Sequence, residues 1–196
     1  MPIASLWMIG SLDSLLFSAQ ILTSIRHHLI LAFALLLLLF FLWGRNLQAP
    51  IHVSDNVYDL LLSTLLSHHV PEISVERLDK SDFHILDARS YREFEVSHIP
   101  GATWVGYEEF SLDRLAGIDK QAPVAVYCAV GYRSERIAEQ LQREGYANVV
   151  NVYGGIFEWV NTKRPVVTDD GAATDKIHGY SQFWGFWLKR GARIYG

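Results

Sequence analysis

Short apolar runs alternate with short helical segments between residues 83 and 160, and this alternation limits the fold more than any other feature of the chain. The apolar runs are rich in the branched and aromatic residues that favour strands. We predict strands around Ile73 and at 83–88, 102–107, 124–128 and 148–153, and helices at 90–96, 108–116, 134–145 and 155–160. Strands that alternate with helices form a parallel sheet covered on both faces. We therefore expect an α/β domain with a five-stranded, mostly parallel sheet flanked by helices.

A second constraint is the apolar segment from Leu29 to Trp43, which contains no polar side chain. Fifteen residues of helix cover about 22 Å, which is less than the roughly 30 Å of a bilayer's hydrocarbon core. With interfacial residues added, 29–45 reaches the lower limit for a single-pass transmembrane anchor, behind an N-terminal tail at 1–28. A cleaved signal peptide is the alternative, although 28 residues precede the apolar core and no small-x-small site follows it. Arg26 and Arg45 flank the segment equally, which leaves the membrane side of the remaining chain open.

Charge is concentrated behind this leader. Residues 1–50 contain only Asp13, Arg26 and Arg45, so residues 51–196 hold 15 basic and 20 acidic residues. Nucleic-acid binding needs a concentrated basic face, and the acidic balance argues against such a partner. The single cysteine cannot form an intrachain disulfide, and no Cys/His spacing matches a zinc site. We expect neither a metal nor a cofactor.

The flanks of the α/β region differ in character. Residues 50–69 contain apolar residues at helical spacing from Asn56 to Ser67, which predicts a linking helix capped by Asp55 or Asn56. Residues 167–175 form a polar linker, and the rest of the 167–196 tail is aromatic and basic. Such a tail suits a membrane interface, an interaction surface, or packing back on the domain.

The candidate site follows the most strand-like run of the chain, which ends at Cys128. Ligands of open α/β sheets usually bind at the carboxyl edge, where this strand delivers the sulfur. We predict Ser134 as the N-cap of the next helix, which places the sulfur over unpaired N–H groups at the positive end of the helix dipole. Gly131 permits the turn, and Arg133 adds a permanent cation, so the loop favours a nucleophilic thiolate beside a bound anion. The predicted substrate-binding loop comprises Ala129, Val130, Gly131, Tyr132, Arg133 and Ser134.

Six segments of the chain carry motifs of one known family in the family's order. Three segments, ISVERL (73–78), Asp87-Ala88-Arg89 and Tyr91 to Phe94, stand where the family has its opening, a D-x-R strand end and a short helix. Three more, SHIPGA (97–102), CAVGYRS (128–134) and GGIFEWVNTKRP (154–165), stand for its G-H-I-P-G-A turn, its C-x-x-G-x-R-S loop and its closing G-G-x-x-x-W and Pro. In all six the chain resembles the rhodanese (thiosulfate sulfurtransferase) homology domain. Ser97 stands where glycine is usual. The resemblance covers about residues 70–166 and implies a rhodanese-like fold of the single-domain type.

The resemblance also implies a sulfurtransferase that works through a persulfide. Cys128 would take the outer sulfur of thiosulfate or a persulfide donor, and a thiol or a protein cysteine would accept it. Asp87 and Arg89 would support the rim of the site by pairing across the turn. Family members often carry a basic residue directly after the cysteine, whereas this chain has Ala129, which leaves Arg133 as the main charge for a dianionic donor.

Two other functions stay open. A phosphatase or arsenate reductase of the related fold has five residues between its cysteine and arginine, whereas four separate Cys128 from Arg133, and the shorter loop favours sulfur chemistry. A membrane-held module that binds a protein partner or senses oxidants without turnover could also contain this domain.

Overall fold

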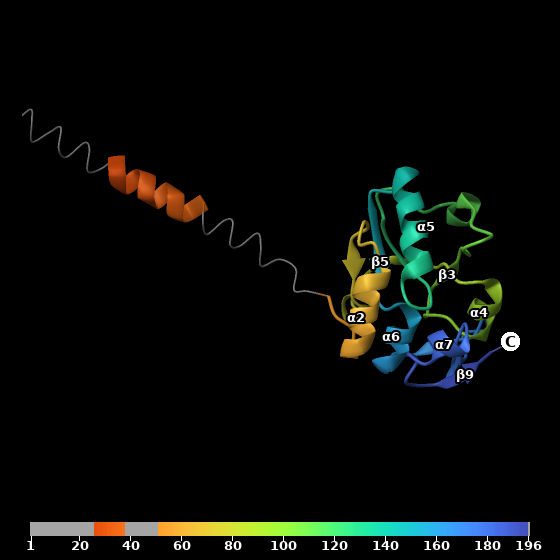
Figure 1. The fold of residues 1–196 in the computed structure, drawn as a ribbon. Coiled ribbons are helices and arrows are strands. Elements are labelled where there is room, and N and C mark those ends of the chain that lie inside the picture. Colours follow the sequence, from red (N-terminus) through yellow and green to blue (C-terminus); the bar gives the residue numbers. More distant parts are fainter. Residues whose placement is uncertain (1–25, 38–50, 196) are drawn as a thin grey trace, which may run out of the picture. The chain divides into compact units, whose positions relative to one another are not determined.

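The structure is a computed structural model, and it describes residues 26–37 and 51–195. The chain divides into two compact units at Pro50, and the second unit runs from Ile51 to Gly196. Residues 26–37 form a helix whose residues are all exposed (Figure 1). Within the described residues, no helix combines the length and the apolarity needed to cross a membrane. The predicted transmembrane helix at 29–45 is therefore not confirmed, and its portion from residue 38 onward lies outside the described residues.

The second unit is built on a five-stranded sheet in which every pairing is parallel. The strands are β1 (Glu72–Ile73), β2 (His84–Asp87), β3 (Thr103–Trp104), β4 (Pro123–Tyr127) and β5 (Asn148–Val152). Their order across the sheet is β1-β5-β4-β2-β3, which puts β4 at the centre. Val126 of β4 pairs with Leu86 on one side and with Asn151 on the other. The predicted α/β class and strand number are confirmed, although β3 is shorter than the predicted 102–107.

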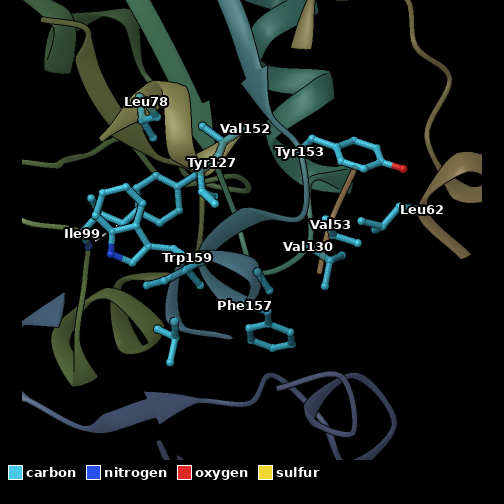
Figure 2. Close-up of a cluster of buried hydrophobic side chains, with 14 of the residues drawn as sticks. Val53, Leu62, Leu78, Ile99, Tyr127, Val130, Val152, Tyr153, Phe157 and Trp159 are labelled. Atoms are coloured by element: carbon cyan, nitrogen blue, oxygen red, sulfur yellow. Dashed lines mark hydrogen bonds between the residues drawn. The ribbon is translucent and has the colours of Figure 1, made fainter. Parts of the chain in front are cut away.

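Helices cover both faces of the sheet (Figure 1). They are α2 (Asn56–Leu65), α3 (Val75–Leu78), α4 (Tyr91–Val96), α5 (Tyr132–Arg143) and α6 (Gly155–Asn161). Alternate residues of a strand point to opposite faces. Val124 and Val126 accordingly share a buried cluster with α5, whereas Ala125 and Tyr127 belong to a second cluster with α2 and α6. Figure 2 shows this second cluster, which includes Val130 of the predicted loop.

One predicted helix is largely absent. The prediction was a helix over 108–116, but the structure has only a short 3₁₀ helix, Leu112–Leu115. Ser111 caps it by accepting a hydrogen bond from the Asp113 amide, so the helix begins four residues later than predicted. The Arg114 side chain then donates back to the carbonyl of Glu109, which fixes the preceding residues in a turn.

The C-terminal segment packs on the domain, as one of the three alternatives for the 167–196 tail predicts. Its elements are β6 (Val166–Val167), β7 (Ala173–Thr174), β8 (Lys176–His178), α7 (Gln182–Gly185) and β9 (Ala192–Ile194). β6 and β7 form an antiparallel pair, so 167–175 is a hairpin rather than the predicted linker, because its polar residues occupy the turn. Ile177 and Leu188 are fully buried, and Trp187 stacks on Tyr58 of α2 with ring centroids 5.4 Å apart.

Candidate active site

The sheet and α5 place Cys128 as the sequence predicts. β4 ends at Tyr127, so Cys128 is the first residue beyond the carboxyl edge of the central strand. The Gly131 amide donates a hydrogen bond to Cys128 Sγ at 3.2 Å. Gly131 has φ +113°, a conformation that L side chains rarely adopt, which explains the need for glycine where the loop turns its amide inward. An amide aimed at sulfur stabilises negative charge there.

Ser134 is not the N-cap that we predicted. α5 begins at Tyr132, and Gly131 occupies the cap position without a side-chain hydrogen bond. Ser134 is instead fully buried in the first turn, where its hydroxyl donates to Asn151 Oδ1 at 2.7 Å. Asn151 Nδ2 donates to the Gly131 carbonyl at 3.1 Å. Ser134 and Asn151 therefore clamp the end of the loop to β5.

The start of the loop rests on α6. The amides of Ile156 and Phe157 donate to the carbonyls of Cys128 and Ala129, at 2.9 and 3.1 Å. These are free N–H groups of the first helical turn, which need partners outside their own helix. Gly155 makes the close approach possible. An added Cβ there would lie 2.7 Å from the carbonyl carbon and oxygen of Ala129, and closer still to the Cys128 oxygen.

Arg133 lies in the first turn of α5, and its charge is already paired. Its two terminal nitrogens donate to the two carboxylate oxygens of Glu93 in α4, each at 2.7 Å. Burial alone would raise the pKa of Glu93, but the hydrogen bonds and positive charge of Arg133 lower it. Arg133 is therefore one half of a nearly buried ion pair rather than the free cation that the sequence suggested.

Asp87 and Arg89 form the ion pair that we expected, and both are fully buried. Arg89 Nη2 donates to Asp87 Oδ2 at 2.6 Å and to the Ser97 carbonyl at 2.7 Å. The Tyr127 hydroxyl donates to the same carboxylate and accepts a hydrogen bond from the Ile99 amide at 3.2 Å. Burial, followed by the charge of Asp87, raises the pKa of Tyr127 well above its ordinary value. This network joins β2, β4 and the turn at 97–102 beneath the site.

A pocket of about 640 Å³ opens beside Cys128. Ala129, Val130, Tyr132 and Arg133 of the predicted loop line it, whereas the structure does not place Asp87 or Arg89 at its walls. Several wall residues are not among those predicted from the sequence, including Glu93, Glu108, Tyr107, Tyr180 and Trp184. The aromatic residues of the 167–196 tail are the sequence signal that could have indicated the last two. In the part of the chain that is described, no cluster of three or more His, Cys, Asp or Glu residues could hold a metal ion.

A parallel α/β domain with a cysteine at the carboxyl edge of its central strand, followed by a glycine turn into a helix, is a candidate cysteine enzyme. A family model described as the rhodanese-like domain matches residues 71–162. A protein named sulfurtransferase from Allochromatium vinosum is 32% identical over 107 residues, which cover 52% of this chain and 99% of that protein. The chain therefore belongs to the rhodanese-like sulfurtransferase family.

Other relatives match over a smaller share of their length. YrkF of Bacillus subtilis, whose name describes a sulfur carrier protein, is 32% identical over 95 residues, 46% of this chain and 51% of that protein. A tRNA uridine(34) hydroxylase of Hamiltonella defensa is 32% identical over 106 residues, 51% of this chain and 28% of that protein. The chain thus spans about half of YrkF and just over a quarter of the hydroxylase.

Proposed function

We propose that this protein transfers a sulfane sulfur, from thiosulfate or a persulfide donor to a thiol or protein-cysteine acceptor, through a persulfide on Cys128. The observation that carries the proposal is the placement of Cys128, buried at the carboxyl edge of β4, with its sulfur receiving the Gly131 amide beside an open pocket. The family supports sulfur transfer as the class of reaction.

In the first step the Cys128 thiolate attacks the outer sulfur of the donor. A bond forms between the two sulfurs while the donor's own bond to that sulfur breaks, and sulfite or a thiolate leaves with the electron pair. In the second step an acceptor thiolate attacks the outer sulfur of the Cys128 persulfide, and the Cys128 thiolate is regenerated. In the thiolate form that starts the first step and ends the second, negative charge resides on Cys128 Sγ, to which the Gly131 amide donates.

Thiocyanate formation from thiosulfate and cyanide tests the proposal. We expect the wild type to turn over and Cys128→Ser to lose the activity, because a hydroxyl is a far weaker nucleophile at neutral pH. Full activity in Cys128→Ser would overturn the mechanism. Hydrolysis of an aryl phosphate in place of sulfur transfer would identify a phosphatase, and capture of a protein partner without either reaction would identify a binding module.

We also propose that residues 29–45 anchor the protein in a membrane as a single-pass segment. The support is the uninterrupted apolar run from Leu29 to Trp43. Membranes washed with alkaline carbonate should retain the full chain and release a variant that lacks residues 1–50. Release of the full chain by carbonate would overturn the anchor. Labelling of Cys128 by an impermeant thiol reagent in intact cells would then report the side of the membrane.

A further inference from the structure

Most of the exposed surface inside the Cys128 pocket is apolar, although charged side chains also line it. Four aromatic side chains contribute to its walls, namely Tyr107, Tyr132, Tyr180 and Trp184. Leu65 of α2 adds an aliphatic surface. Ligand pockets that are built for organic molecules have roughly 300–1,000 Å³ and largely apolar linings. A volume of about 640 Å³ is therefore far larger than a small inorganic anion such as thiosulfate requires.

The charges at the pocket do not favour a dianion. Three glutamates line it, against the two arginines Arg92 and Arg133. Glu93 already neutralises Arg133 through two hydrogen bonds of 2.7 Å. Beyond that pair, the two carboxylates of Glu108 and Glu109 outnumber Arg92 at the pocket of the Cys128 sulfur, whose reactive form is itself an anion. Like charges oppose binding, so this excess of negative charge favours a doubly negative donor less than a neutral or singly negative one.

Two of the aromatic walls come from the C-terminal segment. The Arg133 guanidinium lies over the Tyr180 ring, 4.8 Å from its centroid. The Tyr180 amide donates to His178 Nδ1 at 3.0 Å, which fixes the backbone next to the ring. Trp184 lies four residues further along, in α7. The segment is held by buried Leu188 and Ile177, so these rings form a fixed wall of the pocket.

We propose that the pocket selects an organic persulfide, whose carbon group is apolar or aromatic and carries little negative charge, and that Tyr180 and Trp184 determine this selectivity. This inference rests on the proposed function. The Cys128 thiolate attacks the outer sulfur of R–S–S–H, the bond between the donor's two sulfurs breaks, and R–S⁻ leaves. The outer sulfur moves with its proton from the donor to Cys128, so Cys–S–S–H forms, charge balances, and the step needs no oxidant or reductant. The carbon group R contacts the aromatic wall.

The test measures the single-turnover rate of Cys128 persulfidation in the full chain, with benzyl persulfide and with thiosulfate as donors. The quantity compared is the ratio of the two rates, so differences in total active protein cancel. We expect Trp184→Ala to lower the benzyl-to-thiosulfate ratio about tenfold, which is the scale of one lost aromatic contact. Tyr180→Ala should act in the same direction, and because Tyr180 is 52% exposed its removal is compatible with folding.

Phe186→Ala is the matched control, because Phe186 is an exposed aromatic residue of the same segment that does not line the pocket. Its ratio should equal that of the wild type. Glu108→Gln together with Glu109→Gln should raise the thiosulfate rate severalfold by removing two repelling charges.

An unchanged ratio in both aromatic variants, with Cys128 persulfidated normally, would overturn the selectivity and leave the proposed function intact. Failure of every donor to persulfidate Cys128 would overturn the proposed function itself, and the inference with it.

Discussion

Replacement of Gly155 by alanine would test how the loop that holds Cys128 is supported. Gly155 has φ +56°, and this left-handed backbone costs an alanine about 1–2 kcal/mol. The added methyl would also lie 2.7 Å from the Ala129 carbonyl, where backbone must move rather than a flexible side chain. Overpacking of this kind adds roughly 1–3 kcal/mol. We therefore expect Gly155→Ala to lower the free energy of unfolding by about 2–5 kcal/mol in total.

Gly155→Ala should also slow sulfur transfer, because the carbonyls that it displaces belong to Cys128 and Ala129. A shift of about 1 Å in a reacting group can cost roughly a hundredfold in rate, so we expect sulfur transfer to fall at least tenfold. Urea denaturation and thiocyanate formation measure the two effects. Gly171→Ala is the control, since Gly171 also has positive φ but has open space around it within the described part of the chain. If the stability and the rate of Gly155→Ala matched those of Gly171→Ala, the close approach of α6 to the loop would be refuted.

Three further predictions concern the pairs and packing around the site. Glu93→Gln should lower the free energy of unfolding by about 3 kcal/mol at neutral pH, because it leaves the Arg133 charge unpaired. The pKa of Glu93 is lowered in the folded state, so the wild type loses this extra stability as pH falls below the ordinary value of about 4.3. The urea denaturation curves of the two proteins should therefore converge in acid. Tyr127→Phe should cost about 1–3 kcal/mol in urea denaturation, because the Asp87 carboxylate and the Ile99 amide each lose a buried partner. Leu188→Ala should lower the free energy of unfolding by about 2–5 kcal/mol, since the side chain is fully buried, and a loss below about 1 kcal/mol would show that the C-terminal segment is not part of the core.

The sequence predicted the features that depend on local pattern. The run at 124–128 reads as a buried strand, because its valine, alanine, tyrosine and cysteine residues follow one another without a charged residue. That strand is the centre of the sheet and delivers Cys128 to its edge. Gly145 lies just beyond the end of α5, and its φ of +91° is the conformation that follows a helix terminus. The short β3 and the missing helix at 108–116 show that weak local preferences yield to tertiary hydrogen bonds such as those of Arg114.

Local pattern could not reveal the contacts that define the site. Glu93 lies 40 residues before Arg133, and Asn151 lies 17 residues after Ser134, so only the folded chain brings each pair together. These pairings change the chemistry of the loop. Arg133 becomes half of an ion pair instead of a free cation, and Ser134 becomes a clamp instead of a cap. Tyr180 and Trp184 reach the pocket from a tail whose sequence alone is equally consistent with a membrane interface.

The most direct test of the sulfur-carrier role is the intact mass of the protein after incubation with a sulfur donor. We expect the full chain to gain the mass of one sulfur atom, peptide mapping to place that atom on Cys128, and cyanide to remove it. Cys128→Ser should gain nothing under the same conditions. If Cys128 stayed unmodified after exposure to both thiosulfate and an organic persulfide, Cys128 would not be the sulfur carrier that we propose.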